Sequence, residues 1–87
     1  MNTIEFKNRL ILILRLRSKI TRQELVKVLN SFWQFNKPNI QANNTVYLCY
    51  SMLVSVLRKF DEVIYTHQHY YYVYKDVLVE HLKTYKC

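Results

Sequence analysis

The first apolar pattern along the chain predicts a helix over residues 4–17. Leu10 and Leu14 stand at helical spacing, with other apolar residues before and between them. Asn2 can cap the start of this helix, and Glu5 follows three residues later. At the end of the segment, apolar and polar residues also alternate as they do in a strand, but the whole segment is longer than an ordinary strand. We therefore expect a helix.

The clearest local signal predicts a second helix over residues 21–35. Thr21 and Glu24 have the spacing of a capping box, in which each side chain bonds the backbone amide of the other residue. Ile20 and Leu25 flank this pair and would pack together as a hydrophobic staple. Only a short link therefore separates the first two helices.

Residues 36–42 are expected to form a loop, because Pro38 disfavours helical backbone at the residue before it. Asn43 or Asn44 would then cap a third helix over residues 44–60. The apolar face expected for this helix consists of Val46, Cys49, Leu53, Val56, Leu57 and Phe60.

After the third helix the pattern changes. Residues 62–66 and 70–74 are rich in β-branched and aromatic residues, which suit a strand, and only three residues separate them. We expect a β-hairpin over residues 62–74 and a short helix over residues 76–86. The predicted fold is mainly α with one β-hairpin (α+β), in the order helix-helix-helix-strand-strand-helix, as a single domain over residues 1–87.

Composition narrows the choice of function. The chain has 87 residues, with 13 Lys and Arg against 6 Asp and Glu, which gives a net charge of +7. This charge favours a polyanionic partner, although it could also serve only to keep the protein soluble. Glycine is absent, so neither a phosphate-cradling glycine loop nor a Gly-flanked nucleophilic serine is expected. We expect no enzymatic activity and no cofactor.

The cysteines and the apolar runs indicate the cellular compartment in which the protein is expected. Cys49 and Cys87 form no cluster, and neither is expected in a disulfide, which predicts a reducing, cytoplasmic compartment. Charged residues interrupt the start of the chain, so no signal peptide is expected. The longest uninterrupted apolar run, residues 10–14, is far shorter than the roughly 20 residues of a membrane span. No membrane association is expected.

The order of elements resembles the winged helix-turn-helix superfamily over residues 4–74. The matching segments are residues 20–25, which open the second helix, and residues 56–60, which close the third. Residues 62–74 would be the wing. The resemblance implies that the third helix enters the DNA major groove and that the hairpin tip approaches the backbone or the minor groove. The small size and the abundant Asn, Lys and Tyr also resemble virus- or plasmid-encoded regulators.

Cations gather around the start of the second helix, where Arg15, Arg17, Lys19 and Arg22 stand close together in sequence. The first helix of a helix-turn-helix motif crosses the DNA backbone, and its N-terminus offers free amides to phosphate. These four residues, with Lys37 in the expected loop, are the candidate contacts to the DNA backbone. The alternative is a solvated basic surface.

Base reading is expected from the start of the third helix. Asn and Gln can bond both edge atoms of adenine, and Thr can contact the thymine methyl group. No Arg or Lys stands there to read guanine, so any preference should lean toward A·T-rich sites. The candidate residues are Gln41, Asn43, Asn44, Thr45, Tyr47 and Ser51.

The expected hairpin supplies two further candidate surfaces. Its tip, His67, Gln68 and His69, would contact phosphate or the minor groove. The histidine spacing matches no recognised zinc site, so no metal is expected. One face of the hairpin would expose aromatic rings, which usually marks an interface. We expect a homodimer through the terminal helices and these tyrosines: Tyr65, Tyr70, Tyr71, Tyr72 and Tyr74.

Two functions follow from these observations. The first is a DNA-binding transcriptional regulator that contacts double-stranded DNA mainly through phosphates. The second is a non-catalytic protein-interaction module, or an inhibitor of a host or partner protein, on the same scaffold. The basic residues around the second helix favour the first function. The scarcity of basic residues on the expected recognition helix favours the second.

Overall fold

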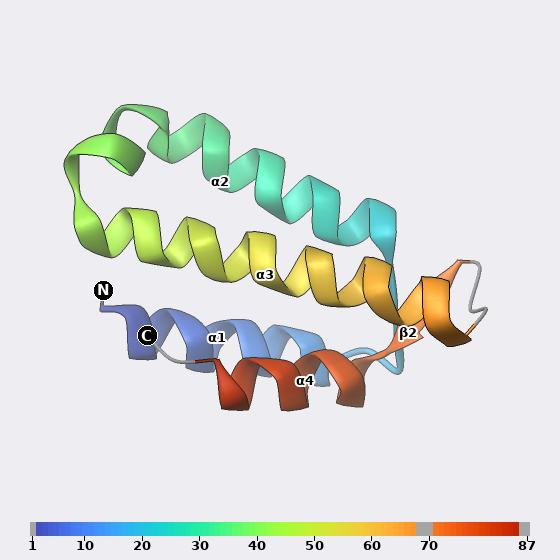
Figure 1. Cartoon of the computed structure of the whole chain (residues 1–87). Coiled ribbons are helices and arrows are strands. Elements are labelled where there is room, and N and C mark those ends of the chain that lie inside the picture. The colour runs from blue at the N-terminus through green and yellow to red at the C-terminus, as the bar shows by residue number, and fades with distance from the viewer. Residues whose placement is uncertain (1, 68–70, 86–87) are drawn as a thin grey trace.

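The computed structural model of the protein describes residues 2–67 and 71–85. The molecule is elongated, with principal extents of 39 × 21 × 21 Å, and α3 lies between α2 on one side and the pair α1 and α4 on the other (Figure 1). The elements in chain order are α1 (Thr3–Arg15), β1 (Lys19–Thr21), α2 (Arg22–Ala42), α3 (Asn44–His67), β2 (Tyr72–Tyr74) and α4 (Lys75–Thr84).

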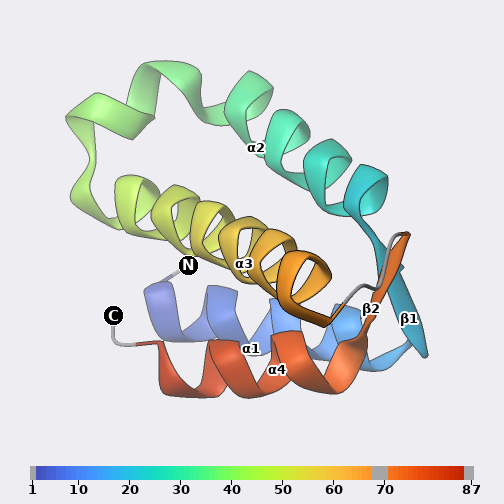
Figure 2. The ribbon, with the colours of Figure 1, turned by 45° about the vertical axis from the view of Figure 1, so that its right-hand side comes forward.

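The two strands come from opposite halves of the chain and pair antiparallel at one end of the molecule (Figure 2). Successive side chains of a strand point to opposite faces, so the central residue of each strand faces the core. Ile20 and Val73 are only 2% and 1% exposed. The paired residues are Lys19 with Tyr74, Ile20 with Val73, and Thr21 with Tyr72.

The mainly helical composition with one small antiparallel sheet agrees with the predicted fold class. The predicted β-hairpin over residues 62–74 is wrong, because residues 62–67 continue α3. Val63 is buried and extends the apolar face of Val56 and Phe60 at helical spacing. Packing along this face outweighed the local β-propensity, which depends strongly on context. The strand that pairs with β2 is instead β1.

The predicted loop over residues 36–42 is also wrong, because α2 continues to Ala42 with Pro38 inside it. Proline removes one hydrogen bond from a helix interior and normally bends the helix, and the ribbon of α2 bends toward its C-terminal end (Figure 2). Ile40, beyond the proline, is buried. This apolar anchor gives the last turns of α2 a packing contribution that a loop would lack.

The core is one apolar cluster that all four helices and both strands supply. Phe60, Met52 and Leu82 have no exposed surface, and Val56 has almost none. The cluster comprises Leu10, Ile11, Leu14, Ile20, Leu25, Met52, Leu53, Val56, Phe60, Val63, Val73, Leu78, Val79 and Leu82. Cys49 is likewise buried on α3, as predicted for an apolar position of that helix.

The predicted helix starts are confirmed by their hydrogen bonds. The side chain of Asn2 accepts a bond of 2.8 Å from the Glu5 amide at the start of α1. Thr21 and Glu24 form the complete capping box of α2. Of the two candidate caps for α3, it is Asn43 whose side-chain oxygen accepts from backbone amides, those of residues 45 and 46.

We expect Thr21→Ala to lower the free energy of unfolding by about 1 kcal/mol, because the cap of α2 is lost. Urea denaturation followed by circular dichroism measures this difference. Thr45→Ala is the matched control, since only the backbone amide of Thr45 takes part in the cap of α3. Equal effects of the two substitutions would show that the Thr21 hydroxyl does not stabilise α2.

Candidate nucleic-acid interface

Five cationic residues gather where α1 ends and where β1, α2 and α4 begin. We call this region the basic end; it comprises Arg15, Arg17, Lys19, Arg22 and Lys75. Four of them were predicted from the sequence. Lys75 was missed because it reaches the region only through the pairing of the two strands. Its Nζ donates a hydrogen bond of 3.0 Å to the Arg15 carbonyl oxygen, and its backbone amide donates to Ser18.

Helix polarity adds to the positive potential of the basic end. The N-termini of α2 and α4 both lie at this end of the molecule (Figure 1). A helix N-terminus carries about half a positive charge, because its first amides have no partner within the helix. Anions are therefore favoured beside both starts, in addition to the attraction of the side chains.

Acidic residues offset part of this charge. Arg17 forms an ion pair with Glu24, whose other carboxylate oxygen is held in the capping box. Arg22 donates from Nε to Asp61 at 3.0 Å. Both arginine side chains remain about half exposed, at 53% and 55%. These two predicted phosphate contacts are thus partly neutralised, and one of the two acidic partners lies 39 residues away in sequence.

Aromatic rings from the sheet adjoin the basic end. The Nζ atom of Lys19 lies 4.3 Å from the centre of the Tyr72 ring, within the range of a cation–π contact. Tyr72 also meets Tyr74 edge to face, with 5.6 Å between ring centres. A hydrogen bond with Tyr72 raises the pKa of Tyr74 above its ordinary value. Tyr71 and Tyr65 are largely exposed. The homodimer expected through these rings stays a prediction.

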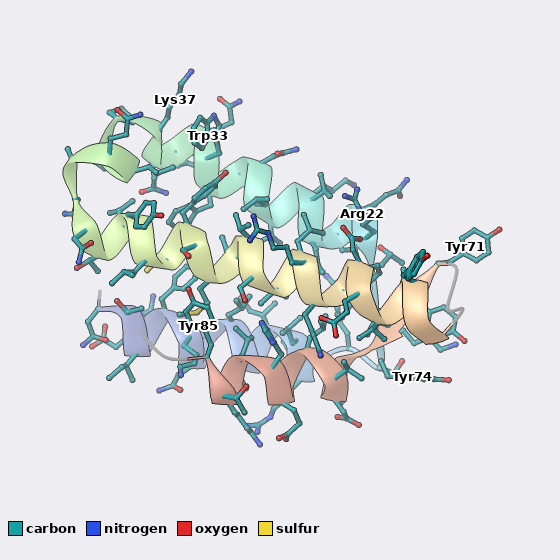
Figure 3. All side chains as sticks on the ribbon, in the orientation of Figure 1. Arg22, Trp33, Lys37, Tyr71, Tyr74 and Tyr85 are labelled. Carbon is teal, nitrogen blue, oxygen red and sulfur yellow. The ribbon has the colours of Figure 1, made fainter. Side chains whose placement is uncertain are left out.

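The residues predicted to read bases lie at the other end of the molecule. Figure 3 places Arg22 at the start of α2, Trp33 near its middle and Lys37 farther toward its C-terminal end. Because a helix rises 1.5 Å per residue, about 22 Å of α2 separates Arg22 from Lys37. Lys37, predicted as a backbone contact, is therefore not part of the basic end. The structure does not bring the two predicted sets together.

Several of the predicted base-reading residues surround a shallow hollow of about 1040 Å³ where α2 turns into α3. Gln41, Asn43, Asn44 and Tyr47 line it, together with Lys37. Asn43 is occupied as a helix cap. The other two candidates do not line this hollow. Thr45 is exposed beside it. The hydroxyl group of Ser51 forms a hydrogen bond of 3.1 Å with the hydroxyl group of Tyr85.

The predicted wing tip falls mostly outside the described residues. Gln68 and His69 are not described, and neither is the side chain of His67, whose backbone ends α3. Within residues 2–67 and 71–85, no group of three His, Cys, Asp or Glu side chains could hold a metal ion. In the same part of the chain, no helix has the length and apolar character needed to cross a membrane.

A serine and a histidine meet between α3 and α4, as they do in hydrolase sites. Ser55 Oγ and His81 Nε2 are 2.7 Å apart. Acyl transfer also needs free amide donors for the developing oxyanion. Both residues stand inside helices, where the backbone amides are bonded within the helix. We therefore assign this pair to the contact between α3 and α4.

Burial lowers the pKa of His81 below its ordinary value of 6.5. The positive charge of Lys59 lowers it further, and the carboxylate of Glu62 partly opposes this change. The neutral ring is thus favoured in the folded protein. The unfolded chain binds more protons in the interval between the two pKa values, so stability rises with pH there.

We expect the free energy of unfolding to fall as the pH is lowered through about 6.5, and to level off below the folded pKa of His81. Urea denaturation at a series of pH values between about 5 and 8 measures this. His81→Gln should remove this part of the pH dependence, while the other two histidines remain in both proteins. An unchanged pH profile in the variant would show that His81 does not contribute to it.

No protein-family model, curated protein or solved structure matches this chain. Its function is therefore inferred from the surfaces of the molecule itself.

Proposed function

We propose that this protein is a non-catalytic DNA-binding protein, with a role in transcriptional regulation, that holds the phosphate backbone at its basic end. The observation that supports this most is the convergence of five cations from α1, β1, α2 and α4 with two helix N-termini. Cations and helix N-termini both favour phosphate, and phosphate contacts supply most of the affinity of non-specific DNA binding.

Three of the five cations are available for phosphate. Within residues 2–67 and 71–85, Arg15, Lys19 and Lys75 form no ion pair, whereas Arg17 and Arg22 do. Each neutralised phosphate contributes about −0.9 to the slope of log affinity against log salt. Three contacts give a slope of about −3. The slope would steepen to about −4.5 if Arg17 and Arg22 left their acidic partners and also contacted phosphates.

Sequence discrimination is expected to be weak. Gln41, the first base-reading candidate, lies about 28 Å along α2 from Arg22 at 1.5 Å per residue, and Asn43 is already occupied as a cap. In a DNA-binding helix-turn-helix the two helices stand at a wide angle, whereas α2 and α3 lie side by side in opposite directions (Figures 1 and 2). The proposal therefore rests on the basic end and not on a recognition helix, and a winged-helix architecture is kept in it only for the order of the elements.

A salt series of binding to duplex DNA, followed by fluorescence anisotropy, tests the proposal. We expect a log–log slope of about −3 for the wild-type protein, and a slope closer to −1 for the double variant Arg15→Gln, Lys19→Gln, because two phosphate contacts are lost.

The matched control is Lys37→Gln, Lys83→Gln, which removes the same charge away from the basic end and should leave the slope nearly unchanged. Equal slopes in the two double variants would place the phosphate contacts elsewhere. Absence of binding to any duplex at low salt would refute the proposal as a whole.

Protein binding is the second candidate function, and a separate surface favours it. Large apolar residues of α1 and α2 are exposed around one hollow between the two helices; among them Ile13 and Phe35 are 53% and 85% exposed. An apolar area of this kind, larger than a scatter of single residues, marks a surface that another molecule covers.

A further inference from the structure

An apolar groove runs between α1 and α2. Both helices pack on α3, at different sides of it (Figure 2), and two hollows of about 330 and 300 Å³ lie between them. Leu10, Ile13 and Val28 line both hollows, so the two are continuous. Phe6 and Phe35 border the far part of the groove. We call this surface the α1–α2 groove.

The groove is more apolar than the fold of the chain requires. In α1, the consecutive residues 10–14 are all apolar, but only Leu10, Ile11 and Leu14 are buried in the core. Ile13 remains 53% exposed and Val28, across the groove on α2, 41% exposed. Leaving such side chains in water forgoes roughly 25 cal/mol for each Å² of apolar area. A ligand that covers the groove would recover this free energy.

The dimensions of the groove suit a helix. Its borders extend from Phe6 on α1 to Arg17, just past the end of that helix, and from Glu24 to Asn36 on α2. The border on α2 therefore covers twelve residue steps, or about 18 Å at 1.5 Å per residue. A helix of about three turns has a similar length and presents anchors at positions i, i+3 or i+4, and i+7 to such a groove.

The rim of the groove is basic. Arg9, Arg17 and Lys27 border it, and the one acidic residue there is Glu24. Glu24 is already engaged by Arg17 and by the cap of α2. Within the described part of the chain, Arg9 and Lys27 form no ion pair. Two uncompensated cations flank the groove, one on each helix.

The charge of the rim determines which occupant fits. A second copy of this chain would bring its own net charge of +7 to a basic rim, and like charges disfavour such association. A helix with acidic flanks complements the rim on both sides. We propose that the α1–α2 groove binds an amphipathic helix of about three turns from another protein, with large apolar residues on one face and Asp or Glu beside them.

This site shares only Arg17 with the basic end, and the charge of Arg17 is paired with Glu24. Val28 and Phe35, its central and far residues on α2, lie along the helix away from Arg22, and none of the three uncompensated cations of the basic end lines the groove. The protein could therefore hold DNA and a protein helix at the same time. The proposal stands on the groove alone and does not depend on DNA binding.

Binding of designed helical peptides by fluorescence anisotropy tests the proposal. The probe is a labelled 14-residue peptide with Leu at the anchor positions and Glu on both flanks; the comparison peptide carries Lys in place of Glu. We expect the acidic peptide to bind at least tenfold more tightly than the basic one. Amide chemical-shift changes on binding should concentrate in residues 6–17 and 24–35.

Val28→Glu places a carboxylate in the middle of the groove at a half-exposed position. This substitution should lower the affinity for the acidic peptide at least tenfold. Leu12→Glu is the matched control, because Leu12 is 60% exposed on α1 but lines neither hollow; it should leave the affinity within about twofold. Circular dichroism and urea denaturation verify that both variants fold.

Three results would overturn the proposal. Failure of the acidic peptide to bind, or equal binding of the two peptides, would remove the acidic helix as the occupant. Concentration-dependent dimerisation that Val28→Glu abolishes would show that a second copy covers the groove. DNA affinity is measured separately with the charge variants of the basic end, so either proposal can fail without the other.

Discussion

The pairing of β1 with β2 around Ile20 and Val73 is the contact on which the arrangement of the helices depends. Both side chains are almost completely buried, and full burial of an aliphatic side chain of this size contributes roughly 1.5–3 kcal/mol. Each strand passes directly into a helix, so the register of this short ladder determines where α2 and α4 begin. It brings Lys75 beside Arg15 and completes the apolar core, which is built around α3. An error in this register by one residue would turn Ile20 toward solvent.

The same contact organises the electrostatics. The ladder brings two helix starts and five cations to one end of the molecule, while α2 and α3 bring Arg22 and Asp61 together. The positive potential that remains is therefore smaller than the number of basic residues suggests. Surface ion pairs of this kind contribute little to stability, typically below about 1 kcal/mol. Their larger effect is to decide which cations are available to a phosphate, which makes charge pairing the main determinant of the proposed DNA affinity.

The long shape of the molecule separates its surfaces. The hollow at the turn between α2 and α3 and the basic end lie at opposite ends of a body 39 Å long, and the α1–α2 groove meets the basic end only at Arg17. α1 has apolar residues on more faces than one partner can cover, because it packs on α3 and α4 and still exposes Ile4, Leu12 and Ile13. Such a helix is typical of an element that meets the core on one side and another molecule on the other. Taken together, the two proposals describe a small adaptor between a polyanion and a protein.

Features that depend on local interactions could be predicted from the sequence. The Thr21–Glu24 capping box and the helical spacing that buries Leu10, Leu14, Val56 and Phe60 involve residues within one or two turns, so they could be predicted. Long-range packing sets the partner of β2, the helical state of residues 62–67 and the extension of α2 past Pro38. Each of these depends on burial against segments distant in sequence, which local propensity does not contain. The same holds for the candidate interface. The cluster of basic residues could be predicted from the sequence. Its ion pairs, the contribution of Lys75 and the distance to the base-reading residues could not, because they depend on how the two halves of the chain pack together.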